Sequence, residues 1–463
     1  MISIEFLYFF LPIFMGLYVA VSPKQRAKIV MLGTVILVGW ANVWGLIPLV
    51  VSVFTSYLGG IAIDNNRDRI IKKRVYLIIT LVINIGIFLA FAYSAYDKTN
   101  FLGGFTYKKL SLDLFYAFGV TSYVMHSVAY CVDIYKGKYR CEHSFSLVAE
   151  YIGFFPVMAA GPFLHFDKIT DTLHNPVVSS EQMAEGIKLM LIGMFEKLLL
   201  SNTMYEVWNN VKSIDTMNLS VATAWVGVLA FSFSFYFELS AFSHFGRGLA
   251  SMLGFEIEKN FNSPFMANGF SDFINRFNIS LTSFAREYIY NNIFTKSKDK
   301  GFALIPALIC GIICSLWYGF GFRTILWTVI IILLIKVEHL LQKPLSVVPY
   351  VFRCIGFNLL YMISIPVFAL STPSKAFEYI LAMFGANIGT GDVLSVYLIR
   401  TSLLIFVLCI IFSTNVMSFF KKKINSLNDN VLIVIQPVYC IALLLLVTAF
   451  LISGNSQLFG LLF

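Results

Sequence analysis

Long apolar runs separated by short polar segments dominate the pattern of this chain. Each clean run is about twenty residues long, the length that an α-helix needs to cross the hydrocarbon core of a bilayer. A helix satisfies its backbone hydrogen bonds internally, so these runs predict transmembrane helices and an all-α polytopic membrane protein. In the second half the clean runs cover residues 185–205, 220–242, 302–320, 322–342, 350–371, 393–414 and 431–453. With the runs of the first half they predict roughly ten to twelve crossings.

Lysine and arginine gather in the short segments between the apolar runs. These basic segments contain Lys24, Arg26 and Lys28; Arg67, Arg69, Lys72, Lys73 and Arg74; Lys136, Lys138 and Arg140; and Lys421, Lys422 and Lys423. Cytoplasmic loops carry such an excess of positive charge, so we expect all of these segments in the cytoplasm. The chain between Lys24 and Arg67 must then cross twice, with a turn near Asn42 to Pro48, and the N-terminus lies outside.

The first apolar run, residues 1–22, lacks a basic leader and a small-residue cleavage site. It therefore predicts a retained first helix rather than a signal peptide. Residues 75–95 are expected to lead outward to an external loop at Phe101–Asp113, and residues 114–135 to return.

Two stretches, residues 145–166 and 260–300, are broken by Pro156, Pro162 and Pro264 and by many polar groups. Irregular backbone at membrane depth is tolerated only where protein or a cavity surrounds it, so both stretches are interpreted as re-entrant or interfacial segments. No internal repeat or linker divides the chain, which favours one domain over residues 1–463.

The composition supports this class. Of the 463 residues, 58% are hydrophobic and 13% charged, whereas a soluble protein carries roughly a quarter charged residues. The chain is therefore expected in the cell membrane as a multi-pass protein. The net charge of +9 comes from the basic loops, which lack interleaved stacking aromatics, so no nucleic-acid partner is expected. The seven cysteines are odd in number without Cys-x-x-Cys spacing, so no disulfide framework or metal site is expected.

Gly311, Ser315 and Gly319 are spaced by four residues. Small residues at this spacing give one helix a face on which another packs closely.

Five motif-like stretches follow one another between about residues 120 and 385. They are Ser127 to Gly137 (SVAYCVDIYKG), Phe154 to Pro162 (FFPVMAAGP), Tyr236 to Ser243 (YFELSAFS), Leu316 to Gly319 (LWYG) and Phe368 to Gly385. The third continues through Gly254-Phe255 and Asn260-Phe261-Asn262-Ser263-Pro264 into Arg276-Phe277-Asn278-Ile279-Ser280-Leu281, with Arg286-Glu287-Tyr288-Ile289-Tyr290 behind. In this order they resemble the membrane-bound O-acyltransferases, in the bacterial branch that modifies polysaccharides and teichoic acids. Ala369 stands where that branch usually has arginine.

The resemblance implies a ring-like bundle of helices with a thin, re-entrant centre around a cavity. There an acyl donor reaches a buried histidine from one side and an acceptor hydroxyl from the other. The implied donor is acyl-CoA or an acyl carrier protein on the cytoplasmic side, used as a substrate, with no bound cofactor. The implied acceptor is a surface polysaccharide or teichoic acid, often with an extracytoplasmic SGNH-type transferase as partner.

The two histidine positions of the family are occupied by Asn278 and Tyr318 in this chain. Acyl transfer to a hydroxyl needs a group that removes its proton near neutral pH, a task that suits histidine. Asparagine cannot act as a base, although its amide can orient a substrate or donate to an oxyanion. Tyrosine titrates near ~10, so about one side chain in a thousand is ionised at pH 7, and a shift of three units takes roughly 4 kcal/mol.

His126 and His244 are candidate relocated bases, because ionisable residues inside membrane segments usually face the protein interior. The alternative for each is a structural hydrogen bond to a neighbouring helix. The side chains expected around the cavity are Trp317, Arg276, Asp272, Ser280, Glu238 and Ser243. Glu238 is expected either to form a buried pair with Arg247 or His244 or to help helices pack, and His165 is expected to lie at a solvated interface.

Three hypotheses follow. The chain is an O-acyltransferase whose base has moved or is dispensable, or a non-catalytic family member that serves as a membrane scaffold or acyl conduit for a separate extracytoplasmic transferase. The third hypothesis is an unrelated transporter, with the broken segments as its binding site. The order of the motifs argues against the transporter, whereas the first two hypotheses stay open.

Overall fold

The computed structural model describes residues 2–97, 119–159, 161–291, 304–318, 321–386, 393–416 and 429–453. Every regular element within these residues is a helix, which confirms the predicted all-α class. The expected external loop at Phe101–Asp113, the basic segment Lys421–Lys423, Ala160 and Gly319 lie outside the described residues.

The helices are mostly α-helical, with short 3₁₀ segments (η2, η4, η6, η7) and π-helical segments (η1, η5, η8). The first part of the chain forms η1 (Phe6–Phe10), α1 (Leu11–Ala20), α2 (Pro23–Ala41), η2 (Val43–Gly45), α3 (Leu46–Asp64), α4 (Ile70–Asp97), α5 (Val120–Lys136), α6 (Phe145–Ile152), η4 (Phe155–Val157), α7 (Phe166–His174), α8 (Ser180–Phe195), η5 (Glu196–Ser201) and α9 (Asn202–Lys212). The second part forms η6 (Thr216–Asn218), α10 (Val221–Met252), η7 (Pro264–Met266), α11 (Phe270–Arg276), α12 (Ile279–Phe284), η8 (Ala285–Tyr290), α14 (Leu304–Tyr318), α15 (Phe322–Leu340), α16 (Gln342–Ser346), α17 (Tyr350–Ala369), α18 (Pro373–Met383), α19 (Val393–Ser413) and α21 (Asp429–Ile452).

Six helices of the described chain are long and apolar enough to span a membrane: α3, α4, α10, α17, α19 and α21. The shorter apolar helices Phe6–Ala20, Phe145–Val157 and Leu304–Tyr318 accompany them. The apolar runs read from the sequence therefore coincide with helices, and the chain is a multi-pass membrane protein. The full number of ten to twelve crossings and the ring arrangement stay predictions.

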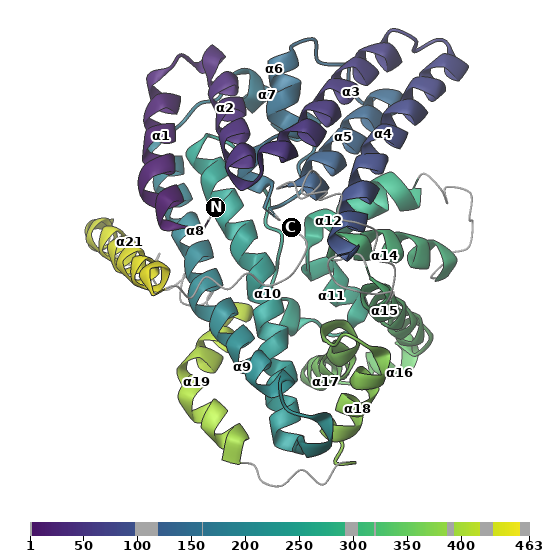
Figure 1. Cartoon of the computed structure of the whole chain (residues 1–463), viewed down its shortest axis with the longest axis vertical. Helices are drawn as coiled ribbons and strands as arrows, with labels where there is room; N and C mark the ends of the chain where they lie inside the picture. Colours follow the sequence, from purple (N-terminus) through teal and green to yellow (C-terminus); the bar gives the residue numbers. More distant parts are fainter. Residues whose placement is uncertain are drawn as a thin grey trace.

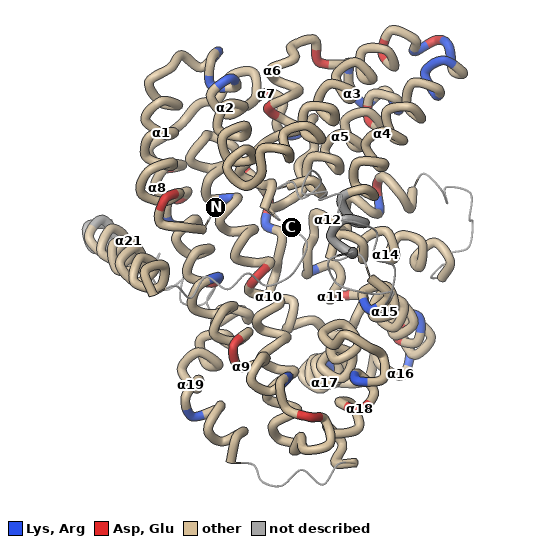
Figure 2. Tube along the Cα trace, in the orientation of Figure 1, with Lys and Arg blue, Asp and Glu red and all other residues tan. Residues whose placement is uncertain are grey.

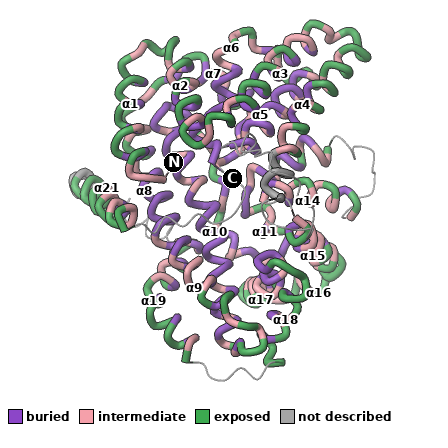
Figure 3. The backbone as a smooth tube through the Cα atoms, in the orientation of Figure 1, coloured by how far each residue is buried: buried purple, intermediate pink, exposed green. Residues whose placement is uncertain are grey.

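Helix α10 runs through the middle of the molecule (Figure 1). In an apolar stretch of 18 residues taken from each helix, 89% is buried in α10, against 17% in α4 and 11% in α21. Figure 3 shows the same contrast, with buried residues concentrated along α8 and α10 and exposed residues on the outer helices. The exposed surface of the outer helices is apolar, as expected of lipid-facing helices.

Glycines let α8 and α10 pack backbone against backbone. A Cβ atom at Gly193 of α8 would lie 2.6 Å from the backbone nitrogen of Phe245. A Cβ atom at Gly248 of α10 would lie 2.6 Å from the carbonyl oxygen of Gly186. Small residues at such a seam allow two membrane helices to approach closely. Gly311 plays the predicted role between α14 and α15, since its Cβ would lie 2.9 Å from the Thr328 methyl group.

The α2–α3 connection turns at η2, where the Asn42 side chain accepts a hydrogen bond from the Trp44 backbone. This turn lies in the range predicted for it, Asn42 to Pro48.

Two of the basic segments meet at one end of the molecule. In the next connection, the Arg67 guanidinium donates to the carbonyl oxygen of Tyr139, 2.9 Å away. In Figure 2 lysine and arginine likewise gather at the α3–α4 turn and at the start of α2.

The two proline-interrupted stretches form short helices rather than full spans. In the first, the Tyr151 hydroxyl of α6 donates to the carbonyl oxygen of Leu164, 3.0 Å away, which holds the returning segment against the helix. In the second, η7, α11, α12 and η8 follow one another within residues 264–290. Their interpretation as re-entrant segments stays a prediction.

Candidate functional site

Asn278 lies at the junction of α11 and α12, in the second proline-interrupted stretch. Its backbone is left-handed, with φ of 50° and ψ of 57°, and its side chain is buried. Asparagine is one of the few residues that tolerate this conformation. The reversal of direction between the two short helices turns the Asn278 amide inward.

Tyr318, the last residue of α14, meets Asn278 directly. The Asn278 Nδ2 donates to Tyr318 Oη at 2.9 Å. The Tyr318 ring packs on Phe235 of α10 with 5.8 Å between ring centroids and edge-on against Trp317 at 4.9 Å. The two positions singled out in the sequence, forty residues apart, are thus brought into contact.

Asn260 holds the other side of the Asn278 amide. Its Nδ2 donates to Asn278 Oδ1 at 3.0 Å, and its Oδ1 accepts from the backbone N–H of Ser280 at 2.8 Å. The Asn260 carbonyl oxygen also accepts from the Ile279 backbone at 2.9 Å. Asn260 was missed by the sequence reasoning, although it lay in a quoted motif, because an asparagine before Pro264 is more often a turn residue.

Two cavities lie on either side of the Asn278–Tyr318 hydrogen bond. The smaller has about 20 Å³, room for about one water molecule, and Asn278, Ser280 and Trp317 line it. The larger has about 490 Å³, within the range of small-molecule sites. It is lined by residues of α11, α12, η8, α14 and α15, including Tyr318, and it opens to the surface. Leu281 borders both cavities.

The larger cavity is apolar in its body and polar at a few positions. Isoleucines of α15, including Ile331 and Ile335, form one wall, and Cys310 and Cys314 of α14 contribute to another. Arg286 of η8 also lines it, and its guanidinium donates to Asn275 Oδ1 at 3.1 Å. Within the described residues no histidine, aspartate or glutamate lines either cavity. The arrangement offers amide, hydroxyl and guanidinium donors, which can bind and polarise a carbonyl group.

His126 is buried and lines neither cavity, although its ring packs on Phe163 of the small cavity with 5.2 Å between ring centroids. Its Nδ1 lies 3.4 Å from the Ile152 carbonyl oxygen, and its Nε2 accepts from the Leu164 backbone at 3.3 Å. Because both ring nitrogens face backbone groups, this is the geometry of a histidine that ties α5 to α6 and to the segment before α7. Its role as a relocated base stays a prediction.

His244 and Glu238, both on α10, each pair with a residue of η5. His244 Nδ1 lies 2.9 Å from Glu196 Oε2. The expected pairing of Glu238 with Arg247 or His244 is wrong: Lys197 Nζ lies 2.6 Å from Glu238 Oε2. The Ser201 hydroxyl also donates to Glu238. Lys197 was out of reach of sequence reasoning because the π-helical turn of η5 aims its side chain at α10.

The other expected cavity residues divide between the site and its surroundings. Ser280 and Trp317 line the small cavity. Arg276 and Asp272 form a partly exposed ion pair along α11, with Nε and Oδ1 2.8 Å apart, and line neither cavity. Ser243 is buried on α10 and also lines neither.

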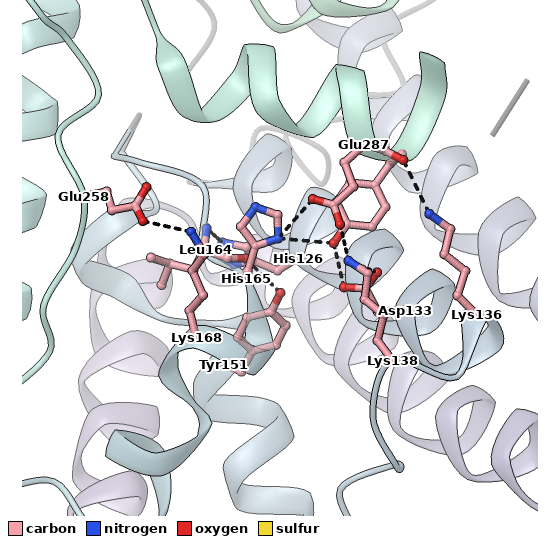
Figure 4. Close-up of polar contacts among 11 residues, drawn as sticks. His126, Asp133, Lys136, Lys138, Tyr151, Leu164, His165, Lys168, Glu258 and Glu287 are labelled. Carbon is pink, nitrogen blue, oxygen red and sulfur yellow. Dashed lines mark hydrogen bonds and ion pairs between the residues drawn. The ribbon is translucent and has the colours of Figure 1, made fainter. Parts of the chain in front are cut away.

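A polar cluster lies where α5 ends beside η8 (Figure 4). Tyr288 donates to Asp133 Oδ2 at 2.7 Å, and Lys138 Nζ lies 3.0 Å from Asp133 Oδ1. Lys138 also pairs with Glu287, and the backbone carbonyl of Glu287 accepts from Lys136 at 3.4 Å. The cluster ties the basic segment after α5 to η8, which directly follows α12.

His165 belongs to this cluster. The expectation of a solvated His165 is wrong, since its side chain is 15% exposed and Tyr288 Oη lies 3.3 Å from its Nδ1. Burial lowers the pKa of His165, against the opposing pull of the Glu287 carboxylate.

From this cluster an aromatic column leads to the small cavity. Phe163, which lines that cavity, packs against Phe284 with 4.8 Å between ring centroids, and Phe284 packs against Tyr288 at 4.9 Å. The rings separate the small cavity from the charged surface. No group of three or more potential metal ligands occurs among the residues that the structure describes.

Comparison with known proteins adds family information to this geometry. The model of the membrane-bound O-acyltransferase family matches residues 141–380. The probable alginate O-acetylase AlgI of Pseudomonas aeruginosa is 26% identical over 328 residues, which cover 70% of this chain and 62% of that protein. The peptidoglycan O-acetyltransferase of Helicobacter pylori is 25% identical, with 70% and 67% covered. The teichoic acid D-alanyltransferase of Lacticaseibacillus rhamnosus is 24% identical, with 43% and 53% covered.

Proposed function

This chain belongs to the membrane-bound O-acyltransferase family, and on that premise we propose that it moves an acyl group, acetyl or a similar one, from a cytoplasmic donor to hydroxyls of a cell-surface polysaccharide or teichoic acid. The proposed donor is an acyl thioester of coenzyme A or of an acyl carrier protein. The acceptor class follows the names of the relatives, which are an alginate O-acetylase, a peptidoglycan O-acetyltransferase and a teichoic acid D-alanyltransferase. Family membership leaves the transporter hypothesis without support.

The observation that carries the proposal is the Asn278–Tyr318 hydrogen bond between two cavities. An acyl transferase has to bring two substrates together at one point. The larger, apolar cavity suits the acyl end of the donor, since apolar lining with a few polar groups is typical of small-molecule sites. The smaller cavity offers the polar side chains of Asn278 and Ser280 to an acceptor hydroxyl.

The reaction balances without a permanent base. The acceptor oxygen bonds to the acyl carbon, the thioester carbon–sulfur bond breaks, and the hydroxyl proton ends on the departing sulfur. A missing general base typically costs on the order of 10²–10⁴ in rate. The proposed enzyme is therefore slow unless another group supplies the proton transfer.

The test compares ester-linked acyl groups on surface polymers in cells that carry the gene, lack it, or carry single substitutions. We expect deletion to remove these groups and Tyr318→Phe to lower them by about 100-fold in initial rate, the typical cost of losing one donor at the reacting carbonyl. His126→Ala and His244→Ala test the relocated base, with expression level as the control. Unchanged acylation after deletion would refute the function.

The second candidate is the non-catalytic member, a scaffold or acyl conduit for a separate extracytoplasmic SGNH-type transferase. The absence of an acidic or imidazole side chain from the described lining of both cavities favours it. It predicts acylation that depends on the gene yet is unaffected by all three substitutions. The double change Asn278→His with Tyr318→His asks whether the cavity supports faster transfer once histidines return.

We further propose that the helices form a ring of ten to twelve crossings around a thin centre. The short helices of residues 264–290, which pack against α14, α15 and α17, support such a centre.

A further inference from the structure

A directed row of hydrogen bonds ends at Tyr318. It runs from the Ser280 backbone N–H to Asn260 Oδ1, from Asn260 Nδ2 to Asn278 Oδ1, and from Asn278 Nδ2 to Tyr318 Oη, over 2.8, 3.0 and 2.9 Å. Asn260 and Asn278 are each 2% exposed, so water competes little for these groups.

The direction of the row follows from its first member. A backbone N–H can only donate, so Asn260 must turn its carbonyl oxygen toward Ser280. The NH₂ group of Asn260 then faces Asn278, which must accept the hydrogen bond with its own side-chain carbonyl oxygen. The Asn278 NH₂ group is thereby left facing Tyr318, and the phenol oxygen accepts. Among the described residues no acceptor is recorded for the phenol proton of Tyr318.

We propose that Asn260 is a positioning residue that fixes this direction and so keeps the Tyr318 O–H free to donate to the acyl carbonyl oxygen. The inference rests on the proposed acyl transfer. It assigns Tyr318 the role of a hydrogen-bond donor instead of a base.

The assignment fits the chemistry of the step. When the acceptor oxygen adds to the acyl carbon, negative charge develops on the carbonyl oxygen, and a fixed donor in a dry site stabilises it. The charge returns to form the ester as the carbon–sulfur bond breaks, and the hydroxyl proton ends on the sulfur. Tyr318 keeps its proton throughout, so the roughly 4 kcal/mol needed to ionise a tyrosine at pH 7 is not required. Donors earlier in the row polarise Tyr318 and strengthen its donation.

Asn260→Asp reverses the row. One carboxylate oxygen still accepts from Ser280 N–H, but the other repels Asn278 Oδ1 and draws the Asn278 NH₂ toward itself. Asn278 then presents its oxygen to Tyr318, which donates its proton there and loses it for the substrate. At pH 8 we expect kcat to fall by about 100-fold or more while KM for the acyl thioester is unchanged, as for removal of one oxyanion donor.

The activity of the Asn260→Asp variant should also depend on pH in a way that native activity does not. Once the introduced carboxyl group is protonated, its O–H donates to Asn278 Oδ1 as the native amide does. Activity should therefore recover as the pH falls through the pKa of the new carboxyl group, whereas native activity shows no such rise. Asn262→Asp, an exposed position two residues away in the same segment, is the matched control and should behave as native.

Raman spectroscopy reads the direction without any enzymatic activity. The intensity ratio of the tyrosine ring doublet differs between a phenol that donates and one that accepts. A difference spectrum against Tyr318→Phe isolates this residue among the 23 tyrosines. We expect Asn260→Asp at pH 8, and not Asn262→Asp, to shift the Tyr318 doublet toward the donor pattern. If Asn260→Asp does not fold, Asn278→Asp takes its place, since its carboxylate also accepts from both neighbours.

The outcomes separate the two proposals. The double variant Asn260→Asp with Tyr318→Phe should be no slower than Tyr318→Phe alone, because both changes remove the same donor. Three results would each overturn the role of Asn260. The first is a loss of kcat in the double variant equal to the product of the two single losses. The others are a loss in Asn260→Asp that does not change with pH and a Tyr318 Raman doublet that Asn260→Asp leaves unchanged. A shifted doublet in a chain that transfers no acyl group would instead uphold the direction of the row and refute the proposed function.

Discussion

At the scale of the residue, Asn278 combines a left-handed backbone conformation with an amide side chain that faces the protein interior. A φ of 50° is adopted mainly by glycine, asparagine, aspartate and histidine among the amino acids. Histidine, which the family resemblance implies at this position, and the asparagine of this chain are both members of that set. Replacement of one by the other therefore preserves the turn between α11 and α12 while it changes the available chemistry.

The left-handed backbone has a measurable consequence for stability. Asn278→Ala and Asn278→Gly remove the same side-chain hydrogen bonds, but only alanine retains a Cβ that the left-handed conformation disfavours. We expect the glycine variant to be the more stable of the two by about 1 kcal/mol, measured by thermal unfolding in detergent.

Ser283, exposed within α12, provides the control for this pair. In a regular helix alanine is favoured over glycine by about 1 kcal/mol, so the order of the Ser283→Ala and Ser283→Gly variants should be reversed. An alanine variant at position 278 as stable as the glycine variant would contradict the left-handed assignment.

The sequence predicted part of this site and not the rest. Asn278 and Tyr318 were identified because their neighbours resemble family motifs. Asn260 and Lys197 were not, because the choice of a hydrogen-bond partner depends on which side chains two distant helices bring within about 3 Å. Spacing along one helix carries no such information, and Glu238 was accordingly assigned the wrong partner.

At the scale of the element, the seam between α8 and α10 positions the central helix. Gly193→Ala would place a methyl carbon 2.6 Å from the Phe245 backbone nitrogen. The two helices must separate to admit it, and we expect a loss of about 1–3 kcal/mol, the usual cost of overpacking. The midpoint of thermal or denaturant unfolding measures this loss.

Gly356 supplies the matched comparison for the seam. It lies within α17, and nothing is found within 4 Å of a Cβ built there. Gly356→Ala should leave stability unchanged or raise it by up to about 1 kcal/mol, because alanine is the better helix former. Equal effects of the two substitutions would show that α8 and α10 are not in backbone contact.

Helices were predicted well from the apolar runs because a crossing helix needs a fixed length of apolar sequence. Their ends were predicted less well. The run at residues 220–242 continues as α10 to Met252, because Ser243 and its successors are shielded by other helices and need not be apolar. The π-helical turn of η5 has no periodic signal in the sequence at all.

At the scale of the whole molecule, the basic segments indicate orientation. Lys24, Arg69 and Arg140 are exposed, and Val43 at the α2–α3 turn is exposed at 67%. In intact cells we expect cysteines at the three basic positions to resist a membrane-impermeant thiol reagent and to react only after permeabilisation, since cytoplasmic loops retain positive charge.

Val43→Cys should react in intact cells, and the unsubstituted chain sets the background from its seven native cysteines. Labelling of any of the three basic positions from outside would contradict the orientation. Labelling of Arg69→Cys without Arg140→Cys, or the reverse, would contradict the shared end that the contact between Arg67 and Tyr139 indicates.

The length of α10 bears on how this protein meets its bilayer. At about 1.5 Å per residue, its 32 residues extend about 48 Å, whereas the hydrocarbon layer is about 30 Å thick. Even a tilt of about 40° leaves an overhang of several ångströms. Other helices surround α10, so the extra length of this helix is not in contact with lipid. Changes in membrane thickness therefore act on the outer helices α4 and α21, whose apolar stretches are only 17% and 11% buried. Helix α10 does not contact the lipid and is not affected directly.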